Sequence, residues 1–317
     1  MGEAANDLAA RTESELTILL YHGVTETPSA GIENYAGKHI AAGLFAAQME
    51  TLRRHCAVLS IDEVVDLSRH GRPFPPRAVV VSFDDGFANN YTIAAPILDA
   101  LRIPAVFYIS SGMVNTNLMF WVDELEDCLN LTAAAAIAVT LERPHEFALS
   151  NREERILALD TIKAYGKRAP APIRDRIRSE VVHATGVEPR AEHAANYRTI
   201  TWDQLRTMAA NPLFTVGGHS LYHDILSEMP AARMQENGRL SLDLLAYQLQ
   251  GPIVHYSYPE GQPHHYNEQV IEALKRYGVI CCPSAIHGLN QRGTDLFHLR
   301  RVMVGFRGCP FPFEHLA

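Results

Sequence analysis

A run of six residues, Ala-Val-Val-Val-Ser-Phe at 78–83, constrains the fold more than any other feature of this sequence. It is apolar throughout and lacks the alternation of a strand that has one face in water. Such strands are typical of parallel sheets, in which helices cover both faces. Asp84, Asp85 and Gly86 follow at once, so the expected strand ends in a turn that carries two carboxylates. The sequence therefore predicts an α/β protein with a parallel sheet.

Strand-like and helix-like segments alternate on both sides of this run. Short apolar runs predict strands, and apolar residues at helical spacing predict helices. Strands are expected at 16–21, 57–59, 78–83, 105–109, 214–217, 253–257, 279–282 and 301–304, and helices at 41–54, from Ile61 onward with Ser60 as N-cap, and at 91–101, 202–210, 231–249 and 267–277. Such strands form an open sheet or a closed barrel, and in either form ligands gather at their C-terminal ends.

The residues from about 111 to 195 interrupt this alternation. They are rich in Ala, Arg and Glu, follow a mostly helical pattern and contain no convincing strand. We interpret them as a helical insertion within one domain that covers 16–317, after a polar tail at 1–15. The Arg- and Glu-rich stretch at 152–180 is expected to be the solvated face of helices.

Polar side chains with metal-binding and catalytic chemistry stand just after the expected strands. One of the two carboxylates at 84–85, together with His219 and His223, would give a divalent metal three ligands and leave a position open for water. The other carboxylate would be free to take a proton from that water. Each motif alone has a simpler interpretation, as a strand-end turn or as surface histidines, but their combination predicts metal-assisted hydrolysis.

These residues resemble the motifs of the polysaccharide deacetylases, carbohydrate esterase family 4. Ser-Phe-Asp-Asp-Gly at 82–86 matches the [ST]FDDG motif, His-Ser-Leu-Tyr-His at 219–223 matches H[ST]xxH, and Tyr-His-Gly-Val at 21–24 resembles the opening YHxV of bacterial members. The resemblance implies a distorted (β/α)7-type barrel. It also implies that Asp84 is the general base and that Asp85, His219 and His223 bind the metal, with Zn²⁺ expected although other divalent ions serve some members.

The sequence departs from the family pattern in its third and last motifs. Ser257 stands where an Arg normally tethers the base, and Arg300 or Arg301 could replace that Arg. Glu260 stands where the family has an aromatic residue. A histidine of the family's LxH motif normally supplies the acid, and His298 is not a proper match. His22 is the first candidate for the acid, and His264 and His265 are the next candidates. The candidates for contact with the substrate or the oxyanion are Tyr258, Pro259, Glu260 and Arg301. Trp121 is either a sugar-stacking residue or a core residue.

Composition and the chain ends limit the partners that we expect. A formal charge of −8 argues against nucleic acid as a partner, and no run approaches the ~18 apolar residues of a membrane span. The polar N-terminus lacks the apolar segment of a secretory signal, and the five cysteines lack a disulfide framework, so a cytoplasmic setting is expected.

The function predicted from these residues is metal-dependent removal of an acetyl or formyl group from an amino-sugar substrate. A cytoplasmic precursor in surface polysaccharide assembly is the expected substrate. The alternatives are an amidohydrolase of a small non-sugar amide or cyclic imide, and a catalytically silent metal- or glycan-binding protein.

Overall fold

The computed structural model describes residues 15–26 and 29–316, so the tail expected at 1–15 lies outside the described residues except for Glu15. The chain divides into two compact units. Unit 1 holds the described parts of Met1–Glu26, Gly37–Thr116 and Ile200–Ala317, and unit 2 holds those of Thr27–Ala36 and Asn117–Thr199. Each unit has its own hydrophobic core.

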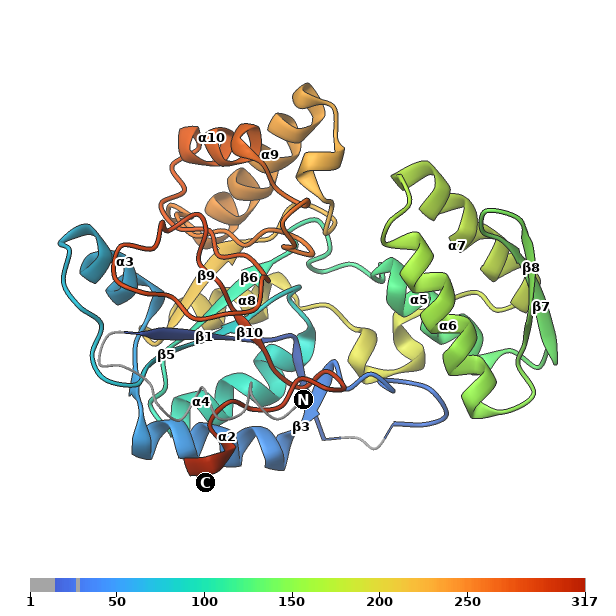
Figure 1. The fold of residues 1–317 in the computed structure, drawn as a ribbon, viewed down its shortest axis with the longest axis horizontal. Coiled ribbons are helices and arrows are strands. Elements are labelled where there is room, and N and C mark those ends of the chain that lie inside the picture. Colours follow the sequence, from blue (N-terminus) through green and yellow to red (C-terminus); the bar gives the residue numbers. More distant parts are fainter. Residues whose placement is uncertain (1–14, 27–28, 317) are drawn as a thin grey trace. The chain divides into compact units, whose positions relative to one another are not determined.

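A parallel sheet forms the centre of unit 1 (Figure 1). Its strands are β1 (Leu16–Tyr21), β4 (Ala57–Val58), β5 (Ala78–Phe83), β6 (Ala105–Ile109), β9 (Phe214–Gly218) and β10 (Val302–Met303). They lie in the order β10-β1-β5-β6-β9, and β4 pairs with the beginning of β5. β1 and β5 pair along their whole length, from Leu16 beside Ala78 to Tyr21 beside Phe83. The C-terminal ends of these strands therefore meet at one edge.

Isolated bridges continue the pairing from β9 towards β10. Parallel bridges join Gly218 to Tyr256, His255 to Cys281 and His287 to Arg301. The expected strands at 253–257 and 279–282 are reduced to these bridges, which corrects the prediction. Prolines at 252, 259 and 283 flank the two segments, and proline cannot donate a hydrogen bond to a sheet. The parallel α/β architecture is confirmed, in the form of a distorted barrel of the (β/α)7 type.

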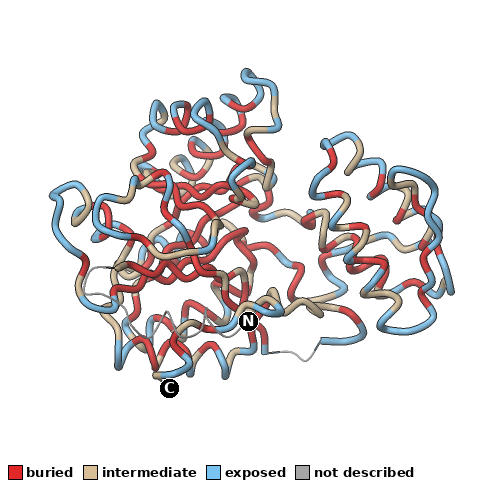
Figure 2. The backbone as a smooth tube through the Cα atoms, viewed as in Figure 1, coloured by how far each residue is buried: buried red, intermediate tan, exposed pale blue. Residues whose placement is uncertain are grey.

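Helices cover the sheet and complete the core of unit 1. They are α2 (Ala42–His55), α3 (Ile61–Arg69), α4 (Ala95–Ala100), α8 (Trp202–Ala209), α9 (Ala231–Leu249) and α10 (Glu268–Arg276). In Figure 1, α2 and α4 lie on one side of the strands and α9 and α10 on the other. The strands between them are buried, as the red segments of Figure 2 show. A short parallel pair, β2 (Gly23–Thr25) with β3 (His39–Ala41), lies outside the main sheet.

The helix expected at 91–101 is divided into two parts. Residues Asn90–Ala94 form a π-helical turn, in which Ala95 donates its N–H to Asn90, and α4 follows. Pro96 has no N–H to continue the ladder at this point, which gives a physical reason for the change of geometry.

Helix α3 lies at the N-terminal ends of the strands. Ser60 caps it, accepting a bond from the N–H of Glu63 while the Glu63 carboxylate accepts one from Ser60. Its apolar residues Ile61 and Val64 join Val80 in a core on one face of the sheet. The opposite face, with Leu19, Val79, Val81 and Phe107, belongs to a larger core. The run at 78–83 is thus buried on both sides, as its sequence predicts.

Unit 2 contains α5 (Trp121–Leu131), α6 (Arg152–Gly166), α7 (Ala171–Thr185) and an antiparallel hairpin of β7 (Ala136–Thr140) and β8 (Pro144–Ala148). The hairpin corrects the prediction that this region has no strand. Ile137, Val139 and Phe147 are buried in the core, whereas most residues between them are exposed, so these five-residue strands lack the continuous buried run of the central sheet. The described residues 29–36 also belong to this unit, and Ile32 is part of its core.

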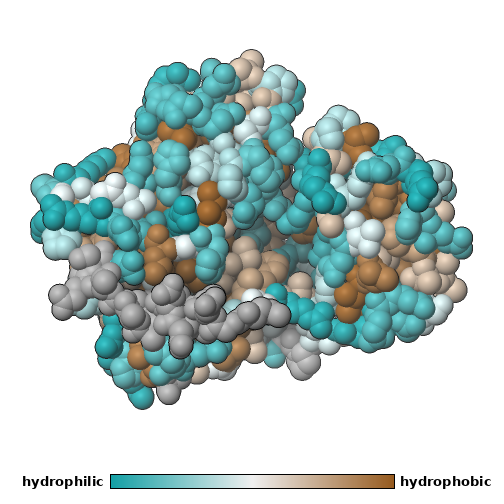
Figure 3. Space-filling view, viewed as in Figure 1, coloured by the Kyte–Doolittle hydropathy of each residue, from teal (hydrophilic) through white to brown (hydrophobic). Residues whose placement is uncertain are grey.

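The face drawn in Figure 3 is mostly polar among the coloured residues, with apolar residues in small groups. Among the described residues, we find no helix with the length and apolar character that crossing a membrane requires. Cys56, Cys128, Cys281, Cys282 and Cys309 are free thiols.

Candidate active site

The carboxylates and histidines of the two motifs converge at the C-terminal edge of the sheet. Asp84 and Asp85 follow β5, and His219 follows β9. The Nε2 atom of His219 lies 3.6 Å from Oδ1 of Asp85, and Nε2 of His223 lies 3.5 Å from the same oxygen. His219 Nε2 is also 3.9 Å from Oδ2 of Asp84. The expected ligands and the expected base therefore form one cluster.

Left-handed backbone conformations shape both loops of the cluster. Asp85 has a φ of 77°, Ser220 of 60° and His223 of 62°, values that cost a side-chain-bearing residue conformational energy. Gly86 follows with a φ of 91°. Strain of this kind persists only where the surrounding structure enforces it, and here it coincides with the cluster.

Hydrogen bonds fix the orientation of His219. Its Nδ1 lies 2.8 Å from the carbonyl oxygen of Ser257, so Nδ1 carries the proton and donates it there. Its backbone N–H bonds the carbonyl of Ile109, and the Ser110 hydroxyl bonds the carbonyl of His219. Burial lowers the pKa of His219, which favours the neutral form. The lone pair on Nε2 is then directed towards the two carboxylates, as in metal-binding histidines.

The donor set of Asp85, His219 and His223 fits a small divalent cation. One ligand atom from each residue lies within 4.8 Å of the others. Two donors about 2 Å from a tetrahedral zinc ion stand about 3.3 Å apart, close to the separations found here. One carboxylate and two imidazoles form a catalytic zinc set that leaves a position for water. Within the described residues, this is the group that satisfies these criteria.

Arg301 holds the second carboxylate. Its NH1 donates to Oδ1 of Asp84 and its NH2 to Oδ2, each at 2.7 Å, across 217 residues of sequence. Both side chains are buried, at 0% and 5% exposure. Burial by itself raises the pKa of Asp84, but the charge and hydrogen bonds of Arg301 outweigh it, aided by His219, and lower that pKa to about 2. Asp84 is therefore ionised at neutral pH.

Ser257 connects the parts of this arrangement. Its hydroxyl accepts a bond from Arg301 NH2 at 2.8 Å and donates to Asp84 Oδ2 at 3.4 Å, and its carbonyl orients His219. The sequence pattern marks Ser257 only as the position where the family's Arg is missing, and it gives no signal for these contacts. In the fold, a small residue here leaves room for the guanidinium that arrives from Arg301, whereas Arg300 is exposed.

His22 follows β1 at the same edge of the sheet. Its ring packs edge-to-face on Phe306 with centroids 5.0 Å apart, and Asn90 donates to its carbonyl. Its buried Nδ1 has no hydrogen-bond partner among the described residues. Burial lowers the pKa of His22 to about 3, with Lys38 and Arg301 adding to the effect and Asp84 opposing it. His22 is thus a neutral imidazole. Its contact with Phe306 joins distant parts of the sequence, and no local pattern predicts it.

The turn after Ser257 places its side chains differently from the prediction. Tyr258 is 1% exposed, stacks on Tyr266 and donates to the carbonyl of Phe297, so its side chain is not available to a substrate. Pro259 is buried, and Glu260 is half-buried with a φ of 58°. Only Glu260 of these three therefore keeps a side chain that a substrate could reach.

The remaining candidates lie in other surroundings. Trp121 belongs to unit 2, where its ring lies against Gly166 of α6 and packs on that unit's core, so its expected contact with sugar stays a prediction. His265 is buried in a loop turn in which Gln262 donates to its Nδ1, and His264 and His298 are exposed.

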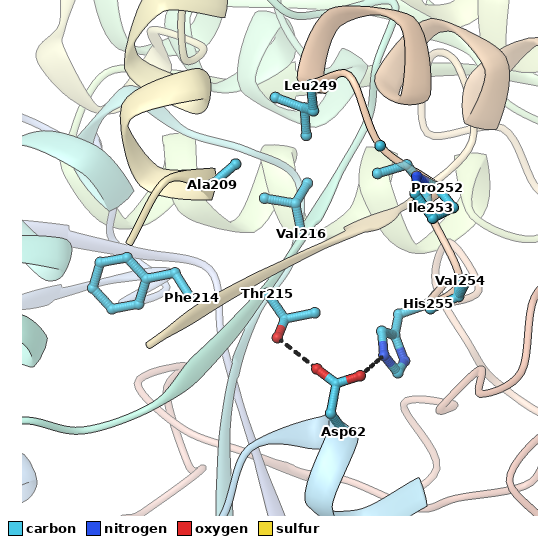
Figure 4. A pocket seen from close by; sticks show the side chains of 11 residues that line it. Asp62, Ala209, Phe214, Thr215, Val216, Leu249, Pro252, Ile253, Val254 and His255 are labelled. Carbon is cyan, nitrogen blue, oxygen red and sulfur yellow. Dashed lines mark hydrogen bonds and ion pairs between the residues drawn. The ribbon is translucent and has the colours of Figure 1, made fainter. Parts of the chain in front are cut away.

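A separate cavity of about 290 Å³ lies beside the first residues of β9 (Figure 4). Asp62 at its edge accepts one hydrogen bond from the Thr215 hydroxyl and pairs with Nε2 of His255 at 2.9 Å. This cavity adjoins α3, at the opposite end of the strands from Asp84. It is not part of the cluster described above.

Comparison with known proteins identifies the family. The profile described as polysaccharide deacetylase matches residues 71–281, a segment that contains both motifs. The chain belongs to the polysaccharide deacetylase family. This membership confirms the family that the two motifs predict.

Curated polysaccharide deacetylases resemble short parts of the chain. The poly-beta-1,6-N-acetyl-D-glucosamine N-deacetylase of Escherichia coli (strain K12) is 41% identical over 58 residues, which are 18% of this chain and 9% of that protein. The enzyme of the same name from Staphylococcus aureus (strain N315) is 34% identical over 87 residues, 27% of this chain and 29% of that protein. The matches thus span less than a third of each relative.

Solved polysaccharide deacetylase structures share the fold over nearly the whole chain. The Streptococcus pyogenes deacetylase PplD in complex with acetate superposes with a TM-score of 0.59 at 16% identity, covering 92% of this chain and 93% of that one. IcaB from Ammonifex degensii gives a TM-score of 0.59 at 19% identity, covering 92% of each chain.

Proposed function

We propose that this chain is a metal-dependent N-deacetylase that hydrolyses the acetamide of N-acetylglucosamine units in an amino-sugar substrate. The observation that carries the proposal is the group Asp85, His219 and His223 beside an ionised Asp84 that Arg301 holds by two bonds. The acetyl group and the sugar are taken from the names of the relatives, which act on poly-beta-1,6-N-acetyl-D-glucosamine.

The residues that would hold the metal are Asp85, His219 and His223, and Zn²⁺ is the proposed ion. When bound there, the metal would polarise the acyl carbonyl and make a coordinated water more acidic. Asp84 accepts a proton from the attacking water at a carboxylate oxygen, because Arg301 keeps it ionised and in place. Water adds to the acyl carbon, the C–N bond breaks, and acetate and a free amine leave.

The departing nitrogen needs a proton, and His22 is the proposed group that supplies it. The imidazole is neutral before the reaction, so it acts as an acid only after a ring nitrogen takes up a proton. Its position after β1, next to the strand that carries Asp84, supports this role. The cytoplasmic setting and a precursor substrate stay predictions, since a precursor and a finished polymer present the same acetamide.

The test combines metal content with acetate release. Protein purified and reconstituted with Zn²⁺ is expected to hold about one ion per chain by elemental mass spectrometry and to release acetate from β-1,6-linked N-acetylglucosamine oligomers. His219→Ala should lose the ion, while His183→Ala, which changes an exposed histidine on α7, should keep it. Asp84→Asn should keep the ion and lose acetate release.

Two outcomes would contradict the proposal. Failure to bind metal after reconstitution would exclude the mechanism, and a metal-loaded protein that releases no acetate would exclude the substrate. In the second case, formyl sugars and small cyclic imides are the next substrates to measure, and inactivity on all of them would favour a silent binding protein.

A further inference from the structure

Tyr222 is an exposed aromatic residue between the two histidine ligands. Its side chain is 54% exposed, whereas those of His219 and His223 are 1% and 18% exposed. Exposure alone is common for single surface residues, but this aromatic side chain also lies in the loop that carries two metal ligands, where a substrate would bind. Among the described residues, Tyr247 on α9 is the other strongly exposed aromatic side chain.

The backbone around Tyr222 is held against the loop that follows β6. Gly112 donates its N–H to the carbonyl of Leu221 at 2.8 Å, and Ser111 donates to that of Ser220 at 3.1 Å. The phenol ring lies over Gly112, where an added Cβ would stand 2.6 Å from Cε1 and 2.8 Å from Cζ. A glycine at this position leaves the space that the ring occupies. The ring is therefore supported on one side, while more than half of the side chain remains open to solvent.

A phenol ring that is supported on one side and exposed on the other can pack against a sugar ring. Pyranose rings present a face of C–H groups that packs on aromatic rings, and their hydroxyls can bond the phenol oxygen. Tyr has few rotatable bonds, so holding it in place costs little conformational entropy. Tyr222 precedes the ligand His223 by one residue, or about 3.8 Å along the chain. Its ring packs on Gly112, which follows β6, so Tyr222 belongs to the same C-terminal edge of the sheet as the metal ligands.

We propose that Tyr222 is a sugar-stacking residue that binds a ring next to the one that loses its acetyl group. The inference rests on the proposed function and adds a specificity for oligomers over single sugars. The loop that carries the metal ligands His219 and His223 would then also bind the neighbouring sugar ring.

The test measures binding to zinc-loaded protein in the Asp84→Asn background, which prevents turnover. A β-1,6-linked N-acetylglucosamine pentamer is titrated by calorimetry. Tyr222→Ala is expected to raise its Kd about 10-fold, the size of one aromatic contact. Tyr222→Leu, which keeps apolar bulk without an aromatic face, should weaken binding similarly, and Tyr222→Phe should restore most of the affinity. Tyr247→Ala serves as the matched control and should bind like the parent.

Three results would overturn the inference. The first is an unchanged Kd in both Tyr222→Ala and Tyr222→Leu with metal content retained. The second is an equal loss of affinity for the single sugar and the pentamer. That result would show that Tyr222 supports the metal-binding loop and does not contact a neighbouring sugar. The third is no binding of the pentamer by the parent, which would contradict the proposed substrate as well. Titration of the parent therefore separates failure of the function from failure of the inference.

Discussion

The contact between Arg301 and Asp84 sets the chemistry of the site at the scale of single residues. A buried carboxylate without a partner would take up a proton, because a charge is costly in an apolar interior. Two parallel hydrogen bonds from a guanidinium keep Asp84 ionised and leave its oxygens in a fixed plane. The same contact makes Asp84 a weak base towards bulk water, so its role depends on its position beside the ligands.

Removing this guanidinium should affect stability and activity together. Arg301→Ala leaves a buried carboxylate uncompensated, which costs roughly 3–5 kcal/mol of unfolding free energy and abolishes acetate release. Arg301→Lys keeps a positive charge but loses the paired bonds. Compared with Arg301→Ala, it should therefore recover part of the stability but little of the activity. Urea unfolding and an acetate assay measure both effects. Arg300→Ala, at the exposed neighbour, is the control, and equal stability of Arg301→Ala and Arg300→Ala would contradict this account.

Replacement of His22 tests its proposed role as the acid. His22→Ala should lower kcat by about 100-fold or more, since general acid catalysis typically contributes that much, while metal content stays at the wild-type level. His298→Ala replaces the exposed histidine near the position where the family's acid is expected, and it should leave kcat unchanged. An unchanged kcat in His22→Ala, or a loss in His298→Ala, would assign the acid elsewhere.

At the scale of elements, helix α3 is attached to the barrel by two polar contacts of Asp62 as well as by its apolar face. Asp62 in its first turn pairs with His255, whose side chain is 1% exposed, and accepts a bond from Thr215 (Figure 4). The hydrogen bond from His255 lowers the pKa of Asp62, although burial opposes the shift. A lowered pKa in the folded state contributes stability above the ordinary pKa of 3.8, which is lost as pH falls through the folded value.

Asp62→Asn is therefore expected to have a pH-dependent effect. Because Asp62 is 61% exposed, the loss of unfolding free energy near pH 6 should not exceed about 1 kcal/mol. The difference from wild type should shrink below about pH 4, where the wild-type carboxyl also becomes neutral. Urea unfolding at several pH values measures it, with Asp243→Asn on the exposed face of α9 as the control. A difference that grows towards acid pH would have the wrong sign.

The separate cores of the two units matter at the scale of the whole molecule. Leu159 lies in the core of unit 2 and Leu98 in the larger core of unit 1, and both are 0% exposed. A Leu→Ala change at either position leaves a cavity and costs about 2–5 kcal/mol. The catalytic cluster draws its supports from unit 1.

We expect Leu159→Ala to speed hydrogen exchange in α5, α6 and α7 while zinc content stays unchanged. Leu98→Ala should instead speed exchange in the strands of unit 1 and reduce zinc content. Exchange mass spectrometry on both variants measures this. Uniformly faster exchange across both units in Leu159→Ala would show that the chain unfolds as one cooperative body.

The sequence by itself determined the features that depend on neighbouring residues. The buried parallel strand at 78–83, the Ser60 cap and the clustering of Asp84, Asp85, His219 and His223 followed from local patterns and from the rule that parallel strands end at one edge. The catalytic roles of these residues stay predictions, since geometry shows their proximity and not their chemistry.

Only the tertiary structure decided which contacts form between distant segments. Arg301, and not Arg300, bonds Asp84 because a bridge to His287 fixes the side from which this segment enters the site. The segment lies 217 residues after Asp84 in the sequence. The membership of Ile32 in the core of unit 2 and the packing of Phe306 on His22 are equally non-local. Local patterns specify what a segment can form, whereas packing and burial between segments select the partners, because the free energy of those contacts exists only in the assembled fold.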